Sequence, residues 1–345
     1  MVSSDTRELL RSDLGRAGIK RRRCGQGFRY FGPHAAPVTD PETLTRIKAL
    51  VIPPAWEDVW ICPHPDGHIQ AIGTDAAGRR QYRYHDLWRE QRDREKHDRM
   101  LEFGAALPHA REVVRRHLAG EGLSRERVLA AAIRLIDLGF FRPGGEEYAA
   151  ENGTFGLATI RRDHVSFAHG QIVFEYTAKG TKEREQAVAD DQVCSVVRSL
   201  RRRKSGGEEL LAYRNGRRWH DVTAADINDH LREIAGGEFS AKDFRTWHAT
   251  VLAAVGLAVS EPAAASDGAR KRAVARVLRE VADYLGNTPA VARASYIDPR
   301  IIELYERGIT IAPALGALGE SASFGELATQ GDAEAAVLDL LARHA

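Results

Sequence analysis

The residues of this sequence best suited to chemistry are one tyrosine, two arginines and one lysine. Tyr296 ends the stretch Tyr284-Leu-Gly-Asn-Thr-Pro-Ala-Val-Ala-Arg-Ala-Ser-Tyr296, and Arg142, Lys179 and Arg245 lie upstream of it. A phenol that attacks phosphorus builds negative charge on two non-bridging oxygens, which a guanidinium binds through a planar fork of donors. The departing sugar oxygen needs a proton, which a lysine can supply when nearby cations lower its pKa. These four residues could therefore transfer a DNA phosphodiester onto a protein side chain without a metal.

Each of these residues also has an ordinary structural interpretation when its motif is considered alone. Arg142 lies in Phe140-Phe-Arg-Pro-Gly144, at the end of a predicted helix whose last carbonyls an arginine commonly contacts. Lys179 follows an alternating segment and precedes a glycine, which is typical of a hairpin turn with a solvated lysine. Arg245 lies in Lys242-Asp-Phe-Arg-Thr-Trp247, in the first turn of a predicted helix, where the dipole disfavours a cation unless an anion is bound. Only convergence on one site would make these residues functional.

A helix stop and a helix start meet just before the tyrosine. In Gly286-Asn-Thr-Pro289, glycine suits the end of one helix, threonine the N-cap of the next and proline its first position. Asn287 lies in this junction, where its amide could donate to an oxyanion. Tyr296 follows two turns later, and a free phenol with a pKa near 10 is a poor nucleophile at neutral pH. The tyrosine therefore needs flanking cations.

Composition excludes several classes of protein. The 345 residues, 43% of them hydrophobic, are enough for two domains with a real core. The three cysteines, Cys24, Cys62 and Cys194, are scattered without CxxC spacing, which argues for a reducing compartment and against a zinc or disulfide framework. No apolar run reaches the roughly 20 residues that span a bilayer, and the N-terminus is polar. We expect a cytoplasmic protein with no membrane span.

The charge distribution favours a polyanionic partner. Net charge is only +2, but residues 7–29 are basic, Arg79-Arg-Gln-Tyr-Arg-Tyr84 interleaves cations with aromatics, and Arg198–Lys204 is a further cluster. Beyond Pro313 the sequence has five acidic residues against one arginine. Any one run could be a solvated face, but several on one chain indicate nucleic-acid binding. The sequence has no GxxxxGK[ST] loop and no acidic cluster suited to magnesium, so we expect neither a nucleotide nor a metal cofactor.

Periodicity predicts an α+β protein with a small antiparallel β domain followed by a mainly α-helical domain that contains a small β-sheet. The predicted parts are a basic segment 1–26, a β-rich DNA-contacting domain 27–86, a linking helix 87–107, a helical catalytic domain 108–312 and an acidic tail 313–345. Pro108 marks the predicted start of the helical domain, because proline seldom lies inside a helix. The acidic tail could pack on the helical domain or discourage non-specific DNA contact.

Alternation and turn residues predict the individual elements. Strands are expected at Val59–Cys62, His68–Ile72, Gln81–Tyr84, Leu157–Ile160 and Ile172–Tyr176, with a return strand after Lys179. Helices are expected at about 108–120, 124–138, 188–203, 223–235, 242–258, 268–285 and 289–298.

Taken together and in order, these motifs resemble the catalytic set of type IB DNA topoisomerases, above all the compact bacterial and poxvirus-type enzymes. The resemblance covers roughly residues 25 to 305. It implies that Tyr296 is the nucleophile, that Arg142 and Arg245 hold the non-bridging oxygens with Asn287 as a further donor, and that Lys179 protonates the leaving oxygen. The segment around Gln81 resembles the one through which these enzymes touch the DNA major groove. The DNA-contacting residues expected on this basis are Arg79, Arg80, Gln81, Tyr82, Tyr84 and Tyr148.

The resemblance implies a tyrosine recombinase/type IB topoisomerase-like fold and a monomer that clamps duplex DNA. Such an enzyme relaxes supercoils by cutting one strand through a 3′-phosphotyrosyl intermediate, swivelling and resealing, without ATP or metal. Two residues depart from the family pattern. Many members have histidine where this chain has Asn287, and asparagine cannot act as an acid. The poxvirus enzymes have a lysine where Gly145 stands, so the resemblance does not imply their pyrimidine-rich cleavage preference for this chain.

Two alternative functions remain open from the sequence. Tyrosine recombinases use a related residue set on a similar helical domain, but their N-terminal DNA-binding domain is usually helical rather than β-rich. A recombinase also needs paired sites, whereas a topoisomerase relaxes a plasmid alone. A non-catalytic DNA-binding protein of the same fold is the second alternative, and a denaturant-resistant protein–DNA adduct would exclude it.

Overall fold

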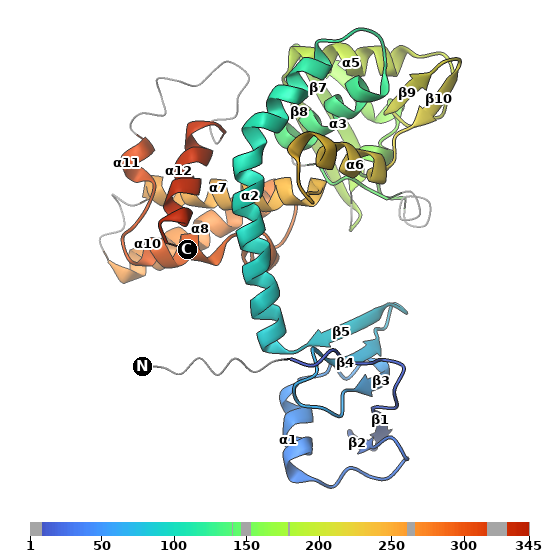
Figure 1. Ribbon diagram of the computed structural model, residues 1–345, viewed down its shortest axis with the longest axis vertical. Helices are drawn as coiled ribbons and strands as arrows, with labels where there is room; N and C mark the ends of the chain where they lie inside the picture. The colour runs from blue at the N-terminus through green and yellow to red at the C-terminus, as the bar shows by residue number, and fades with distance from the viewer. Residues whose placement is uncertain are drawn as a thin grey trace. The chain divides into compact units, whose positions relative to one another are not determined.

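The protein is described by a computed structural model that covers residues 9–139, 141–145, 153–178, 180–260, 266–315 and 330–344 (Figure 1). The chain divides into two compact units, residues 1–97 and 98–345. Helix α2 (Asp86–Leu118) belongs to both. The α+β class expected from the sequence is confirmed. No helix within the described ranges has the length and apolar character of a membrane span.

The N-terminal unit is one antiparallel sheet with a helix, α1 (Pro41–Ala49). The sheet order is β2-β1-β3-β4-β5. Its strands are β1 (Ile19–Cys24), β2 (Gly27–Phe31), β3 (Glu57–Ile61), β4 (Ile69–Thr74) and β5 (Arg80–Tyr84). Ile19, Ile47, Val59, Ile61 and Ala71 form its core. Gly25 closes the β1–β2 hairpin in a left-handed conformation, with a φ of 59°, which glycine adopts without strain.

Strand β1 lies within the segment that the sequence assigns to a basic region outside the sheet. The row of cations in β1 does not prevent its pairing with β2 and β3, because nearby peptide carbonyls accept hydrogen bonds from the Arg21 guanidinium. Arg21 donates to the carbonyls of Ile52, Pro53 and Trp56 at 3.2, 3.0 and 2.6 Å. The guanidinium of Arg21 also lies 4.1 Å from the centre of the Phe28 ring, which makes a cation–π contact between β1 and β2.

The C-terminal unit is mainly helical. Its further helices are α3 (Arg125–Gly139), α5 (Asp191–Arg202), α6 (Ala224–Ala235), α7 (Ala241–Ser260), α8 (Asp267–Leu285), α9 (Pro289–Ser295), α10 (Pro299–Glu306), α11 (Ala312–Leu315) and α12 (Asp332–Ala342). A three-stranded antiparallel sheet contains β6 (Val165–Ala168), β7 (Gln171–Ala178) and β8 (Lys182–Val188), and β9 (Ala212–Asn215) pairs with β10 (Arg218–Asp221). Helix α7 packs against α3, α6, α8, α10, α11 and α12. Its buried residues, including Phe244 and Trp247, are the centre of the core.

Two local predictions differ from the structure. Helix α2 continues through Pro108, because Phe103, Leu107 and Ala110 on either side are buried and hold the helix despite the missing N–H donor. Residues 157–159 form a turn of 3₁₀ helix instead of a strand. The turn is stabilised by Thr159, whose Oγ1 accepts from the Gly156 N–H at 3.0 Å.

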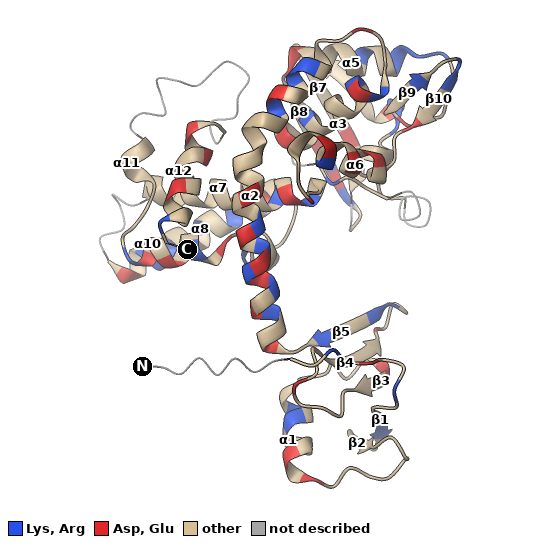
Figure 2. Cartoon of the chain, viewed as in Figure 1, with Lys and Arg blue, Asp and Glu red and all other residues tan. Residues whose placement is uncertain are grey.

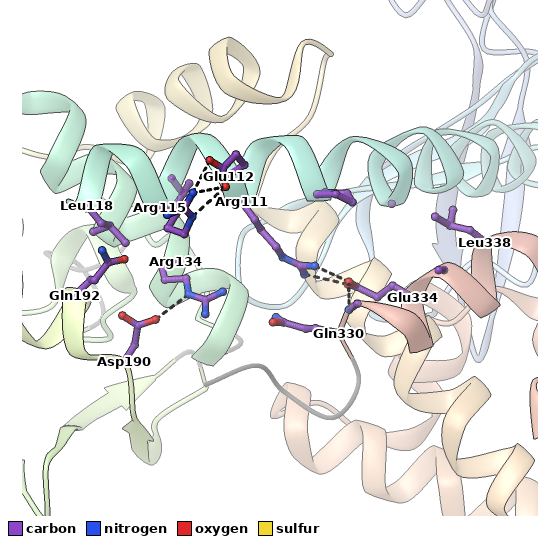
Figure 3. Close-up of a pocket in the computed structure, with 15 residues that line it drawn as sticks. Arg111, Glu112, Arg115, Leu118, Arg134, Asp190, Gln192, Gln330, Glu334 and Leu338 are labelled. Atoms are coloured by element: carbon purple, nitrogen blue, oxygen red, sulfur yellow. Dashed lines mark hydrogen bonds and ion pairs between the residues drawn. The ribbon is translucent and has the colours of Figure 1, made fainter. Parts of the chain in front are cut away.

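Helix α12, in the described part of the acidic tail, carries acidic residues (Figure 2) and packs on the helical unit through a buried charge network (Figure 3). Arg111 of α2 binds Glu334 of α12 at 2.5 and 3.0 Å, and it binds Asp137 of α3 through two contacts of 2.9 Å. Trp247 of α7 donates to Glu334 at 2.9 Å, and His248 contacts Asp137 at 3.1 Å. Four helices therefore meet at these charges, beside a cavity of about 470 Å³.

Burial opposes the ionised carboxylate of Asp137, yet Arg111 and His248 hold its pKa well below the usual range. The folded pKa is therefore lower than the unfolded one. The stability that Asp137 contributes is present above pH ~4 and is lost as the pH falls below that value.

Replacement of Glu334 by alanine should destabilise the C-terminal unit strongly. The variant leaves the Arg111 guanidinium with one fewer carboxylate and the Trp247 N–H without its acceptor. Loss of one partner from such a buried pair costs about 3 kcal/mol. Urea unfolding followed by circular dichroism measures the change. The matched control is Asp339→Ala on the same helix, because Asp339 pairs with Arg343 at the surface and should contribute about 0.5 kcal/mol. Equal losses in the two variants would contradict the structural role of Glu334.

Candidate active site

The tyrosine is positioned by the junction between α8 and α9, which forms as its residue types predict. Gly286 ends α8 in the left-handed conformation, with a φ of 64°. Thr288 caps α9 by accepting from the N–H of Val291, and Pro289 is the first helical residue. Tyr296 follows the last turn of α9, where its N–H donates to the Ala292 carbonyl at 3.0 Å. Its side chain is 9% exposed.

Arg142 is held by close packing of two backbone segments after α3. The N–H of Leu157 donates to the Arg142 carbonyl at 2.8 Å. Gly144 and Gly156 lie in contact, and a Cβ on Gly156 would come within 2.4 Å of the Gly144 Cα. Both positions therefore require glycine. From this fixed backbone, Arg142 Nη2 donates to the Oδ1 of Asn287 at 2.6 Å.

Arg245 comes from the first turn of α7. The start of this helix is stabilised by Ser240, whose N–H and hydroxyl donate to the Asp243 carboxylate at 2.8 and 3.0 Å. Arg245 is only 2% exposed, and its Nη2 donates to the Leu285 carbonyl at 2.7 Å. Its guanidinium carbon lies 5.3 Å from the centre of the Tyr296 ring. The two side chains that the sequence proposes as cation and nucleophile are therefore neighbours.

The electrostatics of the site make the phenol of Tyr296 easier to ionise. Burial alone raises the pKa of Tyr296, but the charges of Arg245 and Arg142 outweigh burial and bring this pKa below the ordinary value. Burial and repulsion from Arg142 lower the pKa of Arg245 to about 10, so Arg245 stays cationic at neutral pH. The arrangement therefore has concentrated positive charge beside a partly activated phenol, as transfer of a phosphodiester requires.

A small cavity of about 70 Å³ opens beside these cations. It is lined by Arg142, Phe155, Tyr176, Ala178, Lys182, Glu183, Arg184, Arg245, Leu285 and Gly286. Three guanidiniums in one lining suit an anion. Within the described parts of the chain, no group of three or more histidine, cysteine, aspartate or glutamate side chains could hold a metal ion.

The structure brings together Arg142, Arg245, Asn287 and Tyr296, which come from three segments that lie far apart in the sequence. Lys179 and Tyr148 lie outside the described residues. The chain neighbours of Lys179 belong to the β7–β8 hairpin, and Ala178 from this hairpin lines the same cavity.

The predicted DNA-contacting residues of the N-terminal unit lie in strand β5 or directly before it, and they form two groups. Arg79 and Gln81 bind the Asp75 carboxylate at 3.0 and 2.8 Å, and hydrogen bonds led by the Arg79 backbone N–H lower the pKa of Asp75 to about 2. Arg80 covers the ring of Tyr82 at 5.8 Å, and Tyr82 stacks on Tyr84 with 6.1 Å between ring centroids. The second group is an aromatic and cationic surface, whereas the first stabilises the β4–β5 turn.

Sequence reasoning missed Arg184, which contributes the third guanidinium of the cavity. Its neighbours in β8 are mostly charged, so the local sequence does not distinguish a solvated strand from one that lines a cavity. The missing signal was the register of the hairpin. Tyr176 and Arg184 are directly opposite each other across β7 and β8. A two-residue Lys179-Gly180 turn would instead place Glu183 opposite Tyr176, so the turn expected from the sequence gives a different register.

Comparison with known proteins gives two family matches. Residues 85–310 match the family model described as "Eukaryotic DNA topoisomerase I, catalytic core", and residues 27–75 match "Bacterial DNA topoisomerase IB, N-terminal domain". The DNA topoisomerase 1B of Acanthamoeba polyphaga mimivirus is 29% identical over 297 residues, which cover 84% of this chain and 88% of that protein. The DNA topoisomerase 1B of Vaccinia virus (strain Western Reserve) is 19% identical over 233 residues, covering 68% and 71%.

The titration of Tyr296 should show its dependence on the two arginines. The phenolate absorbance of the protein minus that of Tyr296→Phe isolates this residue during an alkaline titration. We expect a midpoint below 10. In Arg142→Ala the midpoint should rise, because burial still raises the pKa while one cation is gone. Arg343→Ala, at the surface of α12, should leave it unchanged. A midpoint of 10 or above in the unmodified protein would contradict the electrostatic argument.

Proposed function

Because the chain belongs to the type IB DNA topoisomerase family, we propose that it relaxes supercoiled duplex DNA by cutting and resealing one strand through Tyr296. The observation that carries this proposal is the convergence of Arg142, Arg245 and Asn287 with a tyrosine whose pKa is lowered. These are the groups that a phosphoryl transfer to a phenol needs.

In the proposed reaction, the Tyr296 oxygen attacks a backbone phosphorus and forms a phosphotyrosyl bond to the 3′ end. The bond from phosphorus to the 5′ oxygen breaks, and the electron pair leaves with that oxygen. Arg142 and Arg245 stabilise the charge on the non-bridging oxygens. Asn287 adds a donor, since its Nδ2 is buried with no hydrogen-bond partner in the described structure. Asparagine is sufficient at this position because the proposed role requires only a hydrogen bond and no proton transfer.

Lys179 is proposed to give its proton to the leaving 5′ oxygen. Its place between β7 and β8, two strands that line the cavity of the arginines, supports this role. Nearby guanidiniums would lower the pKa of a lysine there and make it a better acid. In the reverse step, the same amine takes the proton back as the 5′ hydroxyl attacks the phosphotyrosine.

The cycle needs no energy source. One phosphoester replaces another of similar energy, and the broken strand swivels about the intact one before the reverse attack seals it. Two arginines supply the charge stabilisation that a metal ion provides in other phosphoryl-transfer enzymes. We therefore propose that the reaction requires neither ATP nor a divalent metal.

The N-terminal β domain is proposed to contribute DNA contacts through Arg79, Arg80, Gln81, Tyr82 and Tyr84, of which Arg79 and Gln81 also hold the turn. Tyr148 is proposed as a contact of the helical catalytic domain. Contacts to phosphates would make the affinity fall with salt. We propose that a monomer clamps the duplex and acts in the cytoplasm. The match of residues 27–75 to a bacterial domain supports a bacterial enzyme.

Relaxation of a supercoiled plasmid in EDTA without nucleotide tests the proposal. The protein should relax the plasmid and form a denaturant-resistant adduct at a 3′ end. Tyr296→Phe should bind the plasmid nearly normally but do neither, because it lacks the attacking oxygen. A plasmid without recombination sites also separates this function from that of a tyrosine recombinase. Relaxation by Tyr296→Phe would reject the nucleophile, and failure of the unmodified protein would reject the function.

A substrate with sulfur in place of the leaving 5′ oxygen tests Lys179. A thiolate leaves without a proton, so Lys179→Ala should cut this substrate far faster than it cuts ordinary DNA. The cleavage rate of Arg245→Ala should be about 10²-fold lower on both substrates, because the role of Arg245 is to stabilise the oxyanion. Equal impairment of Lys179→Ala on the two substrates would show that Lys179 is not the acid.

A further inference from the structure

Three arginines from three different elements contact the α8–α9 junction within four residues. Arg245 of α7 donates to the Leu285 carbonyl at 2.7 Å, and Arg142 donates to the Asn287 side chain at 2.6 Å. The third is Arg184 of β8, whose Nη2 donates to the Tyr284 carbonyl at 2.7 Å. Arg142 and Arg245 have proposed roles at the phosphate, whereas Arg184 has none.

Arg184 approaches the junction closely. A Cβ on Gly286 would lie 2.5 Å from its Nη1, so the guanidinium occupies the space that a side chain at this position would need. The carbonyl that it binds is in the last turn of α8, where the helix dipole favours a cation. Arg184 is half-buried and directly opposite Tyr176 in the β7–β8 pairing. It therefore connects the hairpin to the junction.

The junction needs such a support. Gly286 has wide conformational freedom, and α9 beyond it is only seven residues long. Arg142 holds the Asn287 amide by donating to its Oδ1, and the Nδ2 of the same amide is the donor proposed for the phosphate. A shift of the turn by a fraction of an ångström would move this donor relative to the phosphate.

We propose that Arg184 is a positioning residue for strand cleavage, which holds the α8–α9 junction so that the Asn287 amide stays in place beside Arg142. This inference rests on the proposed function. Arg184 acts through the backbone at Tyr284 and Gly286 and does not itself contact the scissile phosphate. Its effect on the reaction therefore depends on the presence of the Asn287 side chain.

A double-mutant cycle on strand cleavage tests this dependence. The substrate is a duplex whose short 5′-hydroxyl fragment dissociates after the cut, so that excess enzyme gives a single-turnover cleavage rate. Arg184→Ala should lower the rate at saturating enzyme about tenfold, the equivalent of one charge-assisted hydrogen bond, with little change in DNA affinity. The double variant Arg184→Ala/Asn287→Ala should cut no more slowly than Asn287→Ala alone.

Several results would overturn the inference. Losses that multiply in the double variant would show that Arg184 acts independently of Asn287. A weaker DNA affinity with an unchanged saturated rate would make Arg184 a DNA-backbone contact. Tyr296→Phe is assayed beside these variants. If Tyr296→Phe does not cut while the rate losses of Arg184→Ala and Asn287→Ala multiply in the double variant, only the role of Arg184 is wrong. Cleavage by Tyr296→Phe would overturn the proposed function itself.

Two further variants separate positioning from folding. Glu185→Ala changes the next residue of β8, which is exposed, and should cut at the rate of the unmodified protein. Arg184→Met keeps the apolar stem of the side chain but removes the guanidinium. It should show the same dependence on Asn287 as Arg184→Ala, with a melting temperature close to that of the unmodified protein. A rate for Arg184→Met equal to that of the unmodified protein would also overturn the inference.

Discussion

The site depends on the placement of one buried and one half-buried guanidinium whose hydrogen bonds go to neutral oxygens. The Leu285 carbonyl and the Asn287 amide oxygen accept from Arg245 and Arg142, which satisfies donor groups without cancelling charge. The cost of this arrangement is visible in Arg245, whose pKa falls to about 10 through burial and the repulsion of Arg142. A phosphate between these cations would relieve that repulsion, and the developing charge of a transition state would relieve it further. Binding and catalysis thus have one electrostatic origin.

The second arginine cluster of the same unit shows the contrast. Arg111 is also largely buried, but its partners are the carboxylates of Asp137 and Glu334. Burial lowers the pKa of Arg111, while these two anions raise it more, so the net shift is upward. An arginine paired with carboxylates has its charge neutralised and contributes to stability. An arginine bound to carbonyls keeps its charge available for a substrate. Arg111 and Arg245 are both largely buried, so the identity of their acceptors, rather than burial, distinguishes these two arginines.

Local patterns made much of the site predictable from the sequence. The Gly286–Pro289 junction forms as its residue types require, and the hydrophobic periodicity of α3, α7 and α8 sets which residues are buried. Other features depend on distant parts of the chain. Arg184 donates to the Tyr284 carbonyl, 100 residues away, and Pro108 is tolerated in α2 because of packing from other elements. Strand β1 forms since carbonyls between Ile52 and Trp56, some 30 residues away, satisfy one of its arginines. No window of local sequence contains these partners.

The role of each carboxylate in the acidic tail likewise depends on the donor that it accepts from. Glu334 lies 223 residues from Arg111 in the sequence, yet it neutralises that guanidinium and accepts from Trp247 of α7. Trp247 is two positions after Arg245, so the helix that presents the proposed oxyanion-binding arginine is fixed at its own first turns by α12. Acidic residues in the tail therefore differ in what they do. Glu334 stabilises the core, whereas Asp339 forms a surface pair with Arg343. The carboxylates that contact Trp247 and His248 stabilise the core beside α7 without pairing with Arg245, so they do not compete with a phosphate for that guanidinium.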